Sequence, residues 1–162
     1  MSADSLQVTT PSDTELVLTR RFDAPRHLVF DALTTPELLK RWHGARGWHL
    51  VECEVDLRVG GAWRFVSRGP GGEPMGHSGT YREVARPDRL VYTERYDDQW
   101  VEGETLVTAV LVEVDERTTV TTTLRYPSQE VRDVAVASPM ERGVGESYAR
   151  LDAVLAEVHP SR

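Results

Sequence analysis

The residues best suited to chemistry in this sequence are His, Tyr and Glu side chains on segments that alternate in polarity. His77 and Tyr81 lie on one such segment, and Tyr92 and Glu94 share one face of a later segment. A histidine or tyrosine beside a carboxylate is the usual pair for general acid–base catalysis. A solvated or hydrogen-bonded structural histidine is the simpler interpretation of His77, so no residue is assigned a catalytic role.

The histidines and the single cysteine do not suggest a metal or a nucleophile. The five histidines form no HExxH motif and no paired His/Cys spacing typical of zinc. The segment GHSG at 76–79 lacks the strand–turn–helix setting of a nucleophile elbow. Cys53 lies on the apolar side of its segment and is interpreted as inert core. We therefore expect neither a metal nor a cofactor.

Aromatic residues fall on the same faces as these polar groups. Trp63 and Phe65 share a face, and Trp42 ends a short helical segment. If these faces point inward, they form an apolar pocket with a few polar groups, as in most small-molecule sites. Packing within an ordinary core is the alternative for each of them. The candidate ligand-binding residues are Trp42, Trp63, Phe65, His77, Tyr81, Tyr92, Glu94, Met140, Val144 and Tyr148.

The composition of the chain limits which binding partners and which cellular location are expected. The 162 residues carry a formal net charge of −7, which makes nucleic acid a poor partner. No segment approaches the length of a membrane span, so no membrane insertion is expected. No basic segment followed by an apolar one opens the chain, and the lone cysteine suits a reducing interior. These features predict a cytoplasmic protein.

The chain divides into a short tail and one domain. Residues 1–13 are small and polar and are expected to form a disordered N-terminal tail. Residues 14–159 are expected to form a single domain, which opens with an alternating strand at 14–22. Two short helices follow, with Pro25 and Pro36 in their first turns. After these helices, apolar and polar residues alternate with a period of two, which is typical of strands. The whole chain is expected to contain about seven strands joined mostly by short loops.

The strongest helical period lies at the C-terminus. Ser138, Pro139 and Glu141 predict a capping box that opens a long helix. The apolar residues of one face are Met140, Val144, Tyr148, Leu151, Leu155 and Val158. Gly143 and Gly145 interrupt this helix, and close packing against a neighbouring tryptophan is the favoured explanation over room for a ligand.

This order of elements predicts an α+β fold, in which a curved antiparallel sheet wraps around the long C-terminal helix. A cavity between sheet and helix, closed at one end by the two short helices, is compatible with it. A tightly packed sandwich has the same element order.

Four segments in this order resemble one family: LTRRFDAPRHLVFDALTTPELLKRWHG, GGAWRF, GHSGTYREVARPDRLVYTERY and YPSQEVRDVAVASPMERGVGESYARLDAVL. The chain resembles bacterial homologues of the activator of heat-shock protein 90 ATPase, within the START-like (SRPBCC) superfamily. The resemblance covers residues 15–158 and implies a helix-grip fold with a hydrophobic cavity.

The resemblance leaves three functions open. The first is binding of a small hydrophobic or amphiphilic molecule in the cavity. The second is a polyketide cyclase or aromatase-like enzyme that uses the same cavity. The third is a protein-interaction module that modulates a chaperone ATPase, for which no motif here gives support. A homodimer is a further expectation.

Overall fold

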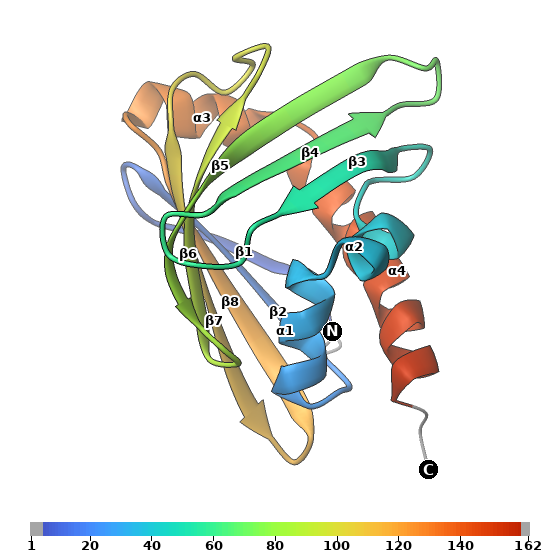
Figure 1. The fold of residues 1–162 in the computed structure, drawn as a ribbon. Helices are drawn as coiled ribbons and strands as arrows, with labels where there is room; N and C mark the ends of the chain where they lie inside the picture. Colours follow the sequence, from blue (N-terminus) through green and yellow to red (C-terminus); the bar gives the residue numbers. More distant parts are fainter. Residues whose placement is uncertain (1–4, 160–162) are drawn as a thin grey trace.

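Eight antiparallel strands form one open sheet in the order β1-β2-β8-β7-β6-β5-β4-β3 (Figure 1). The computed structural model describes residues 5–159. The strands are β1 (Gln7–Ser12), β2 (Glu15–Phe22), β3 (His49–Val55), β4 (Ala62–Arg68), β5 (Pro74–Ala85), β6 (Arg89–Tyr96), β7 (Thr105–Val114) and β8 (Arg117–Arg125).

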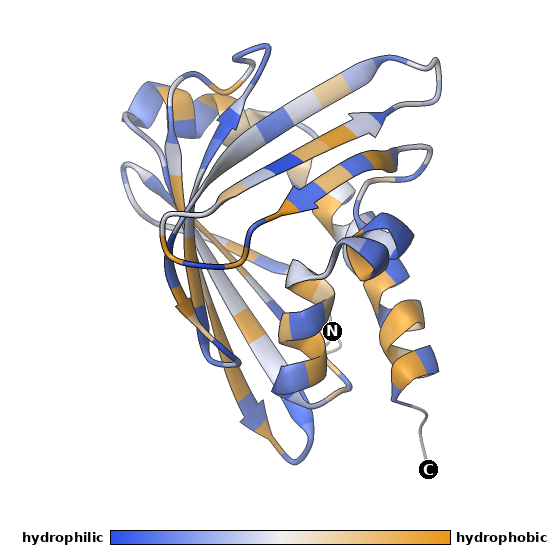
Figure 2. Ribbon diagram, viewed as in Figure 1, coloured by the Kyte–Doolittle hydropathy of each residue, from blue (hydrophilic) through white to orange (hydrophobic). Residues whose placement is uncertain are grey.

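Within these described residues, four helices accompany the sheet: α1 (Arg26–Thr34), α2 (Pro36–Trp42), α3 (Gln129–Ala137) and α4 (Met140–Val158). The sheet bends around α4, whose Leu151 and Leu155 are buried in one cluster with Phe22 and Trp63 from the strands. Figure 2 shows apolar and polar residues alternating along the strands, so that one face supplies this core. The predicted helix-grip fold is confirmed.

The first strand corrects the predicted tail. Residues 7–12 form β1, which pairs with β2 through Val8 and Leu18, so the sheet has eight strands instead of about seven. Most side chains of β1 are exposed on both faces, so the strand carries no apolar period. Its backbone hydrogen bonds to β2 hold it. The first four residues of the predicted tail lie outside the described part of the chain.

The alternation of β2 is as predicted. Leu16, Leu18 and Arg20 point inward, and Phe22 follows them on the same side. Arg20 is only 8% exposed, and its guanidinium bonds to the Asp152 carboxylate of α4 and lies 4.8 Å from the centre of the Phe22 ring. This charged residue therefore joins the sheet to the C-terminal helix.

The alternation of side chains along β3 is interrupted. The register with β4 shifts between Leu50 and Glu52, which is a β-bulge. The extra residue turns Val51 outward, where it is 43% exposed, while Leu50 is buried. Cys53 and Val55 keep the expected inward side and pack against the core.

Helix ends agree only in part with the expected caps. Pro36 occupies the first turn of α2, and the Ser128 hydroxyl accepts a hydrogen bond from the Val131 amide at the start of α3. The capping box at Ser138 is wrong, because Ser138 ends α3 and Pro139 is the N-cap of α4. The Ser138 hydroxyl donates to the Ala135 carbonyl and accepts from the Met140 amide at 3.3 Å. Val158 is 42% exposed and lies outside the buried face of α4.

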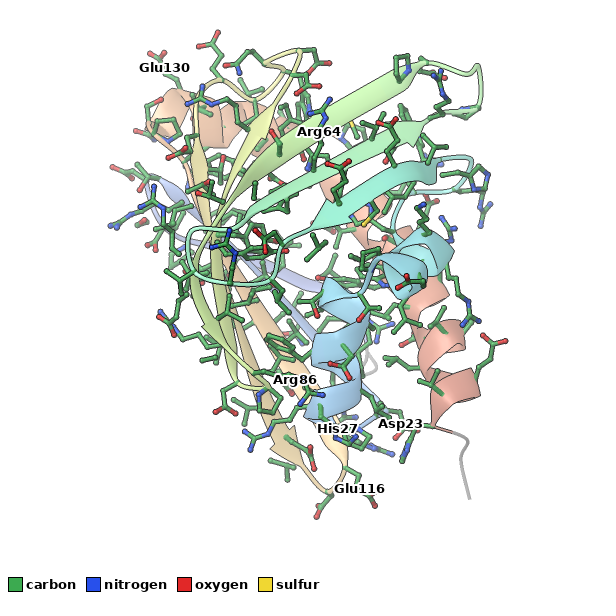
Figure 3. All side chains as sticks on the ribbon, viewed as in Figure 1. Asp23, His27, Arg64, Arg86, Glu116 and Glu130 are labelled. Atoms are coloured by element: carbon green, nitrogen blue, oxygen red, sulfur yellow. The ribbon has the colours of Figure 1, made fainter. Side chains whose placement is uncertain are left out.

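Ion pairs on the surface join neighbouring elements. Arg64 of β4, labelled in Figure 3, makes two hydrogen bonds to the carboxylate of Asp97, just after β6. Arg86, beside α1 in the same view, bonds in the same way to Asp31. In residues 5–159 no helix is both long enough and apolar enough to cross a membrane.

Candidate functional site

A cavity of about 620 Å³ lies between the inner face of the sheet and the first half of α4. The segment after α2 and the loop between β6 and β7 complete its wall. The volume lies within the range of small-molecule sites, and most of the lining side chains are apolar or aromatic. Leu151 and Leu155 in the second half of α4 are buried in the core, whereas Met140, Val144 and Tyr148 in its first half line the cavity.

All ten residues singled out from the sequence line this cavity. They come from α2, β4, β5, β6 and α4, which are separated along the chain and converge only in the folded protein. They are Trp42, Trp63, Phe65, His77, Tyr81, Tyr92, Glu94, Met140, Val144 and Tyr148.

Several wall residues were not among those candidates. Tyr96 lies on the same face of β6 as Tyr92 and Glu94, so strand alternation could have identified it. His43 follows α2, and Trp48 and Trp100 lie on loops, where no period indicates a direction.

Trp63 is the centre of an aromatic wall. Its ring meets Phe65 edge-on at 5.0 Å and Tyr92 at 5.5 Å. The Trp63 indole N–H donates to the Thr93 carbonyl at 3.1 Å. Trp42 is held in the same way, since its N–H donates to the Ala32 carbonyl at 2.9 Å. These two rings are therefore fixed by the protein itself, and their faces and edges provide the apolar surface.

His77 and Glu94 form a buried polar pair on this wall. His77 Nδ1 lies 3.1 Å from Glu94 Oε2, and the two side chains are 5% and 15% exposed. The register of β5 and β6 sets the contact: His77 is opposite Tyr96, and Glu94 lies two residues along the same strand. Such diagonal neighbours are within reach of long side chains. A histidine and a carboxylate therefore meet on the cavity wall, and His77 is hydrogen-bonded, as the simpler interpretation of the sequence holds.

Aromatic rings enclose the His77 imidazole. Tyr96 stacks on it at 5.0 Å between ring centroids, and His43 stacks on it at 5.9 Å. Phe65 meets it edge-on at 5.5 Å. Burial, with smaller contributions from His77 and Arg150, lowers the pKa of His43 to about 3. The His43 ring is therefore neutral at physiological pH.

Two tyrosines beside Glu94 keep their protons. Burial, followed by the negative charge of Glu94, raises the pKa of both Tyr92 and Tyr96 well above the ordinary value. Their phenols therefore act as neutral hydroxyl groups at the cavity wall.

Three buried nitrogen atoms of the wall have no hydrogen-bond partner within residues 5–159: His43 Nδ1, His77 Nε2 and Trp100 Nε1. Buried polar atoms in proteins nearly always have a partner, and an unmade hydrogen bond costs about 1–3 kcal/mol. The partners of these atoms therefore have to come from outside the described residues.

The segment after α2 is tied to α4 by hydrogen bonds. The Ser147 hydroxyl accepts from the Gly44 amide at 3.0 Å and donates to the Trp42 carbonyl at 3.3 Å. Arg150 donates to the carbonyls of Gly44 and Trp48. These bonds position His43 and Trp48 at the cavity.

The glycines of α4 do not fit the expected packing against a tryptophan. A Cβ atom at Gly143 would lie 3.5 Å from the Cβ of Ala45, an ordinary contact, and one at Gly145 would meet no atom within 4 Å. Gly143 instead lines the cavity. Steric demand from the surrounding protein therefore does not explain either glycine.

The described part of the chain contains no cluster of side chains suited to bind a metal ion. Within it, no three His, Cys, Asp or Glu side chains are close enough together to hold a metal ion. Cys53 is partly buried on β3, and burial raises the pKa of its thiol to about 11. The thiol is therefore protonated at neutral pH and a poor nucleophile.

Comparison with solved structures supports the fold. A Rhodobacter sphaeroides protein is 38% identical, with a TM-score of 0.90 over 95% of this chain and 99% of that one. A Nitrosomonas europaea protein is 26% identical, with a TM-score of 0.82 over 94% and 100% of the two chains. An HSP90 activator from Plasmodium falciparum is 19% identical, with a TM-score of 0.60 over 88% and 96%, and this likeness concerns the fold alone.

Among proteins with curated functions, none matches the chain significantly. Residues 23–156, most of the sequence, match the family described as Activator of Hsp90 ATPase homolog 1-like protein. This match confirms the resemblance found in the sequence. The chain belongs to the Activator of Hsp90 ATPase homolog 1-like family.

Proposed function

We propose that this protein binds a small, largely apolar molecule in the cavity between the sheet and α4. The observation that carries the proposal is the cavity of about 620 Å³, whose wall is mostly apolar or aromatic and contains a buried His77–Glu94 pair. Burial of apolar ligand surface contributes about 25 cal/mol per Å². The polar pair orients the ligand.

The first test is native mass spectrometry of gently purified protein, followed by denaturation and identification of any released compound. A thermal-shift measurement with flavone and with a fatty acid then tests binding directly, since a ligand of the folded state raises Tm. A released compound or a Tm shift supports the proposal. Absence of both would contradict it.

A matched pair of variants locates the binding. Val144 lies on the cavity wall, and Val144→Trp fills part of the space, so we expect the Tm shift to disappear. Val134 is 50% exposed on α3 and does not line the cavity, so Val134→Trp is the control and keeps the shift. Equal shifts in both variants would mean that the ligand binds elsewhere.

The second candidate is an enzyme of the polyketide cyclase type in the same cavity. The His77–Glu94 pair favours it, since a histidine positioned by a carboxylate is a common general base. Turnover of the compound released in the mass-spectrometric experiment, and its loss in His77→Phe, would support this function. Unchanged compound after prolonged incubation would count against it.

The third candidate is chaperone modulation in the cytoplasm, for which the description of the matched family is the support. It predicts a complex with a heat-shock protein 90 and a changed ATPase rate. Native mass spectrometry reports such a complex, and also the expected homodimer, from the measured mass. An uncomplexed protein with no effect on the ATPase would contradict this function.

A further inference from the structure

We infer that two copies of this chain associate face to face through the outer side of β2, β8 and β7, related by a two-fold axis that runs along the strands between β2 and β8. This surface is separate from the cavity, so the inference is independent of the proposed function. It gives the homodimer expected from the sequence a defined contact surface.

The outward side chains of these three strands form a continuous uncharged surface. Side chains alternate along each strand, so the residues between the buried ones point outward. These outward residues, called the Val/Thr face below, are Val17, Thr19, Leu106, Thr108, Val110, Val112, Thr119, Thr121 and Thr123. Leu106 and Val112 are 36% and 54% exposed. Exposed surfaces of this kind with a polar rim mark sites of protein association.

The helices of the described chain pack on the opposite side of these strands. The buried residues of α1, α2 and α4 lie in one cluster with the inward Phe22 of β2, and Ala135 of α3 lies in another with Leu16 and Leu18. Figure 1 shows α1, α2 and α4 on the concave side of the sheet. The Val/Thr face is therefore open to a partner.

Opposite charges flank the Val/Thr face at both ends. Glu15 of β2 is opposite Arg125 of β8 at one end. At the other end Asp23, just after β2, has its Oδ1 atom 3.6 Å from Nε of Arg117. Within residues 5–159 the Arg125 side chain has no ion-pair partner, so its charge is available to another chain.

This arrangement of charges is self-complementary. A two-fold axis between β2 and β8 exchanges the two strands, as in isologous dimers. Glu15 of one copy then faces Arg125 of the other, and Asp23 faces Arg117. Each contact occurs twice, and no like charges are brought together at these positions. A second copy of the chain therefore matches the charges of this surface.

The middle of the face and its area also suit a second copy. In the same arrangement Val17 meets Thr123 and Thr19 meets Thr121, which are uncharged pairs. At about 33 Å² for each outward position, three strands offer roughly 400–500 Å² per copy. Stable complexes bury about 800 Å² per partner, so we expect a reversible dimer with a Kd of about 10–100 μM.

The open edges of the sheet are poorer contact sites. Pro11 in the edge strand β1 has no N–H to donate to another strand. The other edge strand, β3, contains the bulge at Leu50–Glu52 and exposes Glu52 and Glu54. Bulges and charges on an edge strand oppose pairing with another chain. Association through the Val/Thr face avoids both obstacles.

Sedimentation velocity over about 1 to 300 μM, which spans the expected Kd, tests for the dimer. Thr121→Arg places two like charges beside the axis and is expected to weaken the dimer at least about tenfold. Val51→Arg introduces the same side chain on the edge strand β3, where Val51 is 43% exposed, and is expected to dimerise like the wild type.

A pair of charge variants gives a second reading that does not depend on the folding of Thr121→Arg. Glu15→Arg brings arginines together across the interface, and Arg125→Glu brings glutamates together, so each variant alone is expected to dimerise weakly. In a mixture of the two, both contacts of a mixed pair join opposite charges. The mixed dimer is expected to form at least about fivefold more tightly than either variant with itself.

Native mass spectrometry distinguishes the mixed dimer from the two others by mass. A wild-type protein that stays monomeric over the whole concentration range would overturn the inference. A dimer that Val51→Arg weakens and Thr121→Arg does not would place the contact at the edge of β3 and overturn it as well. So would a mixture that associates no better than the single variants.

Discussion

The imidazole ring of His43 stacks on that of His77, with ring centroids 5.9 Å apart and 29° between the ring planes. His43 comes from the end of α2, and His77 from the middle of β5. The contact joins the segment after α2 to the sheet beside the cavity, and it buries His43 where a positive charge is unfavourable.

The partly buried His43 predicts a loss of stability in mild acid. Its folded pKa of about 3 lies below the ordinary value of 6.5, so the unfolded chain binds a proton that the folded chain does not. The contribution of the neutral ring is fully present above pH 6.5 and falls by about 1.4 kcal/mol per pH unit as pH decreases towards 3. Urea unfolding at pH 7, 6 and 5 measures this slope.

His43→Gln is expected to have a shallower slope over that range. His27→Gln, at the exposed residue labelled on α1 in Figure 3, is the control and is expected to keep the wild-type slope. Identical slopes in all three proteins would show that His43 is not the group responsible.

Substitution of Gly145 is expected to stabilise the protein. Glycine within a helix costs about 1 kcal/mol relative to alanine, and no atom lies within 4 Å of the position that a Cβ would take at Gly145. Gly145→Ala should therefore raise the free energy of unfolding by about 0.5–1 kcal/mol, measured by urea denaturation.

Gly79→Ala, in contrast, is expected to destabilise the protein. Its Cβ would lie 1.7 Å from the Thr93 carbonyl oxygen of the neighbouring strand, which leaves no room for a methyl group. We expect a loss of more than about 2 kcal/mol. A stability gain at Gly79, or a loss at Gly145, would contradict these expectations.

The Arg20–Asp152 ion pair is expected to matter more than an exposed pair on the same helix. Arg20 is 9% exposed in its side chain, so Asp152→Ala leaves a buried charge without its carboxylate and should cost about 1–3 kcal/mol. Glu157→Ala removes the partner of Arg41 where both side chains are exposed, and should change stability by less than about 0.5 kcal/mol. Comparable losses in both variants, measured by thermal or urea unfolding, would contradict this ranking.

Cys53 is expected to react slowly with iodoacetamide. Burial raises the pKa of its thiol to about 11, so only about one molecule in a thousand carries the thiolate at pH 8. The alkylation rate of the folded protein should rise about tenfold per pH unit from pH 7 to 9. The same protein unfolded in urea is the control, and equally fast alkylation of the folded form would rule out the raised pKa.

The sequence by itself determined the elements whose side chains are periodic. The alternation of Leu16, Leu18 and Arg20 predicted the inward face of β2, and the helical spacing from Met140 to Leu155 predicted the inward face of α4. The family resemblance and the helix-grip fold followed from the order of such elements. Local periodicity suffices here because burial on one face imposes the period of the element.

Where the pattern of apolar residues is absent or interrupted, only the tertiary structure determined how the segment is arranged. Residues 7–12 are mostly exposed, so only backbone pairing with β2 makes them a strand. The bulge at Leu50–Glu52 reversed the side on which Val51 lies, because one extra residue changes the alternation of a strand.

The arrangement of polar groups at the cavity likewise depends on contacts between residues that are far apart in the sequence. All ten candidate residues line the wall, but the pairing of His77 with Glu94 depends on the register of β5 and β6, and the place of His43 on the packing of α2 against α4. Trp100 lies on a loop whose direction no periodicity specifies. Which buried atoms lack a partner depends on every neighbour at once, so only the folded chain could reveal it.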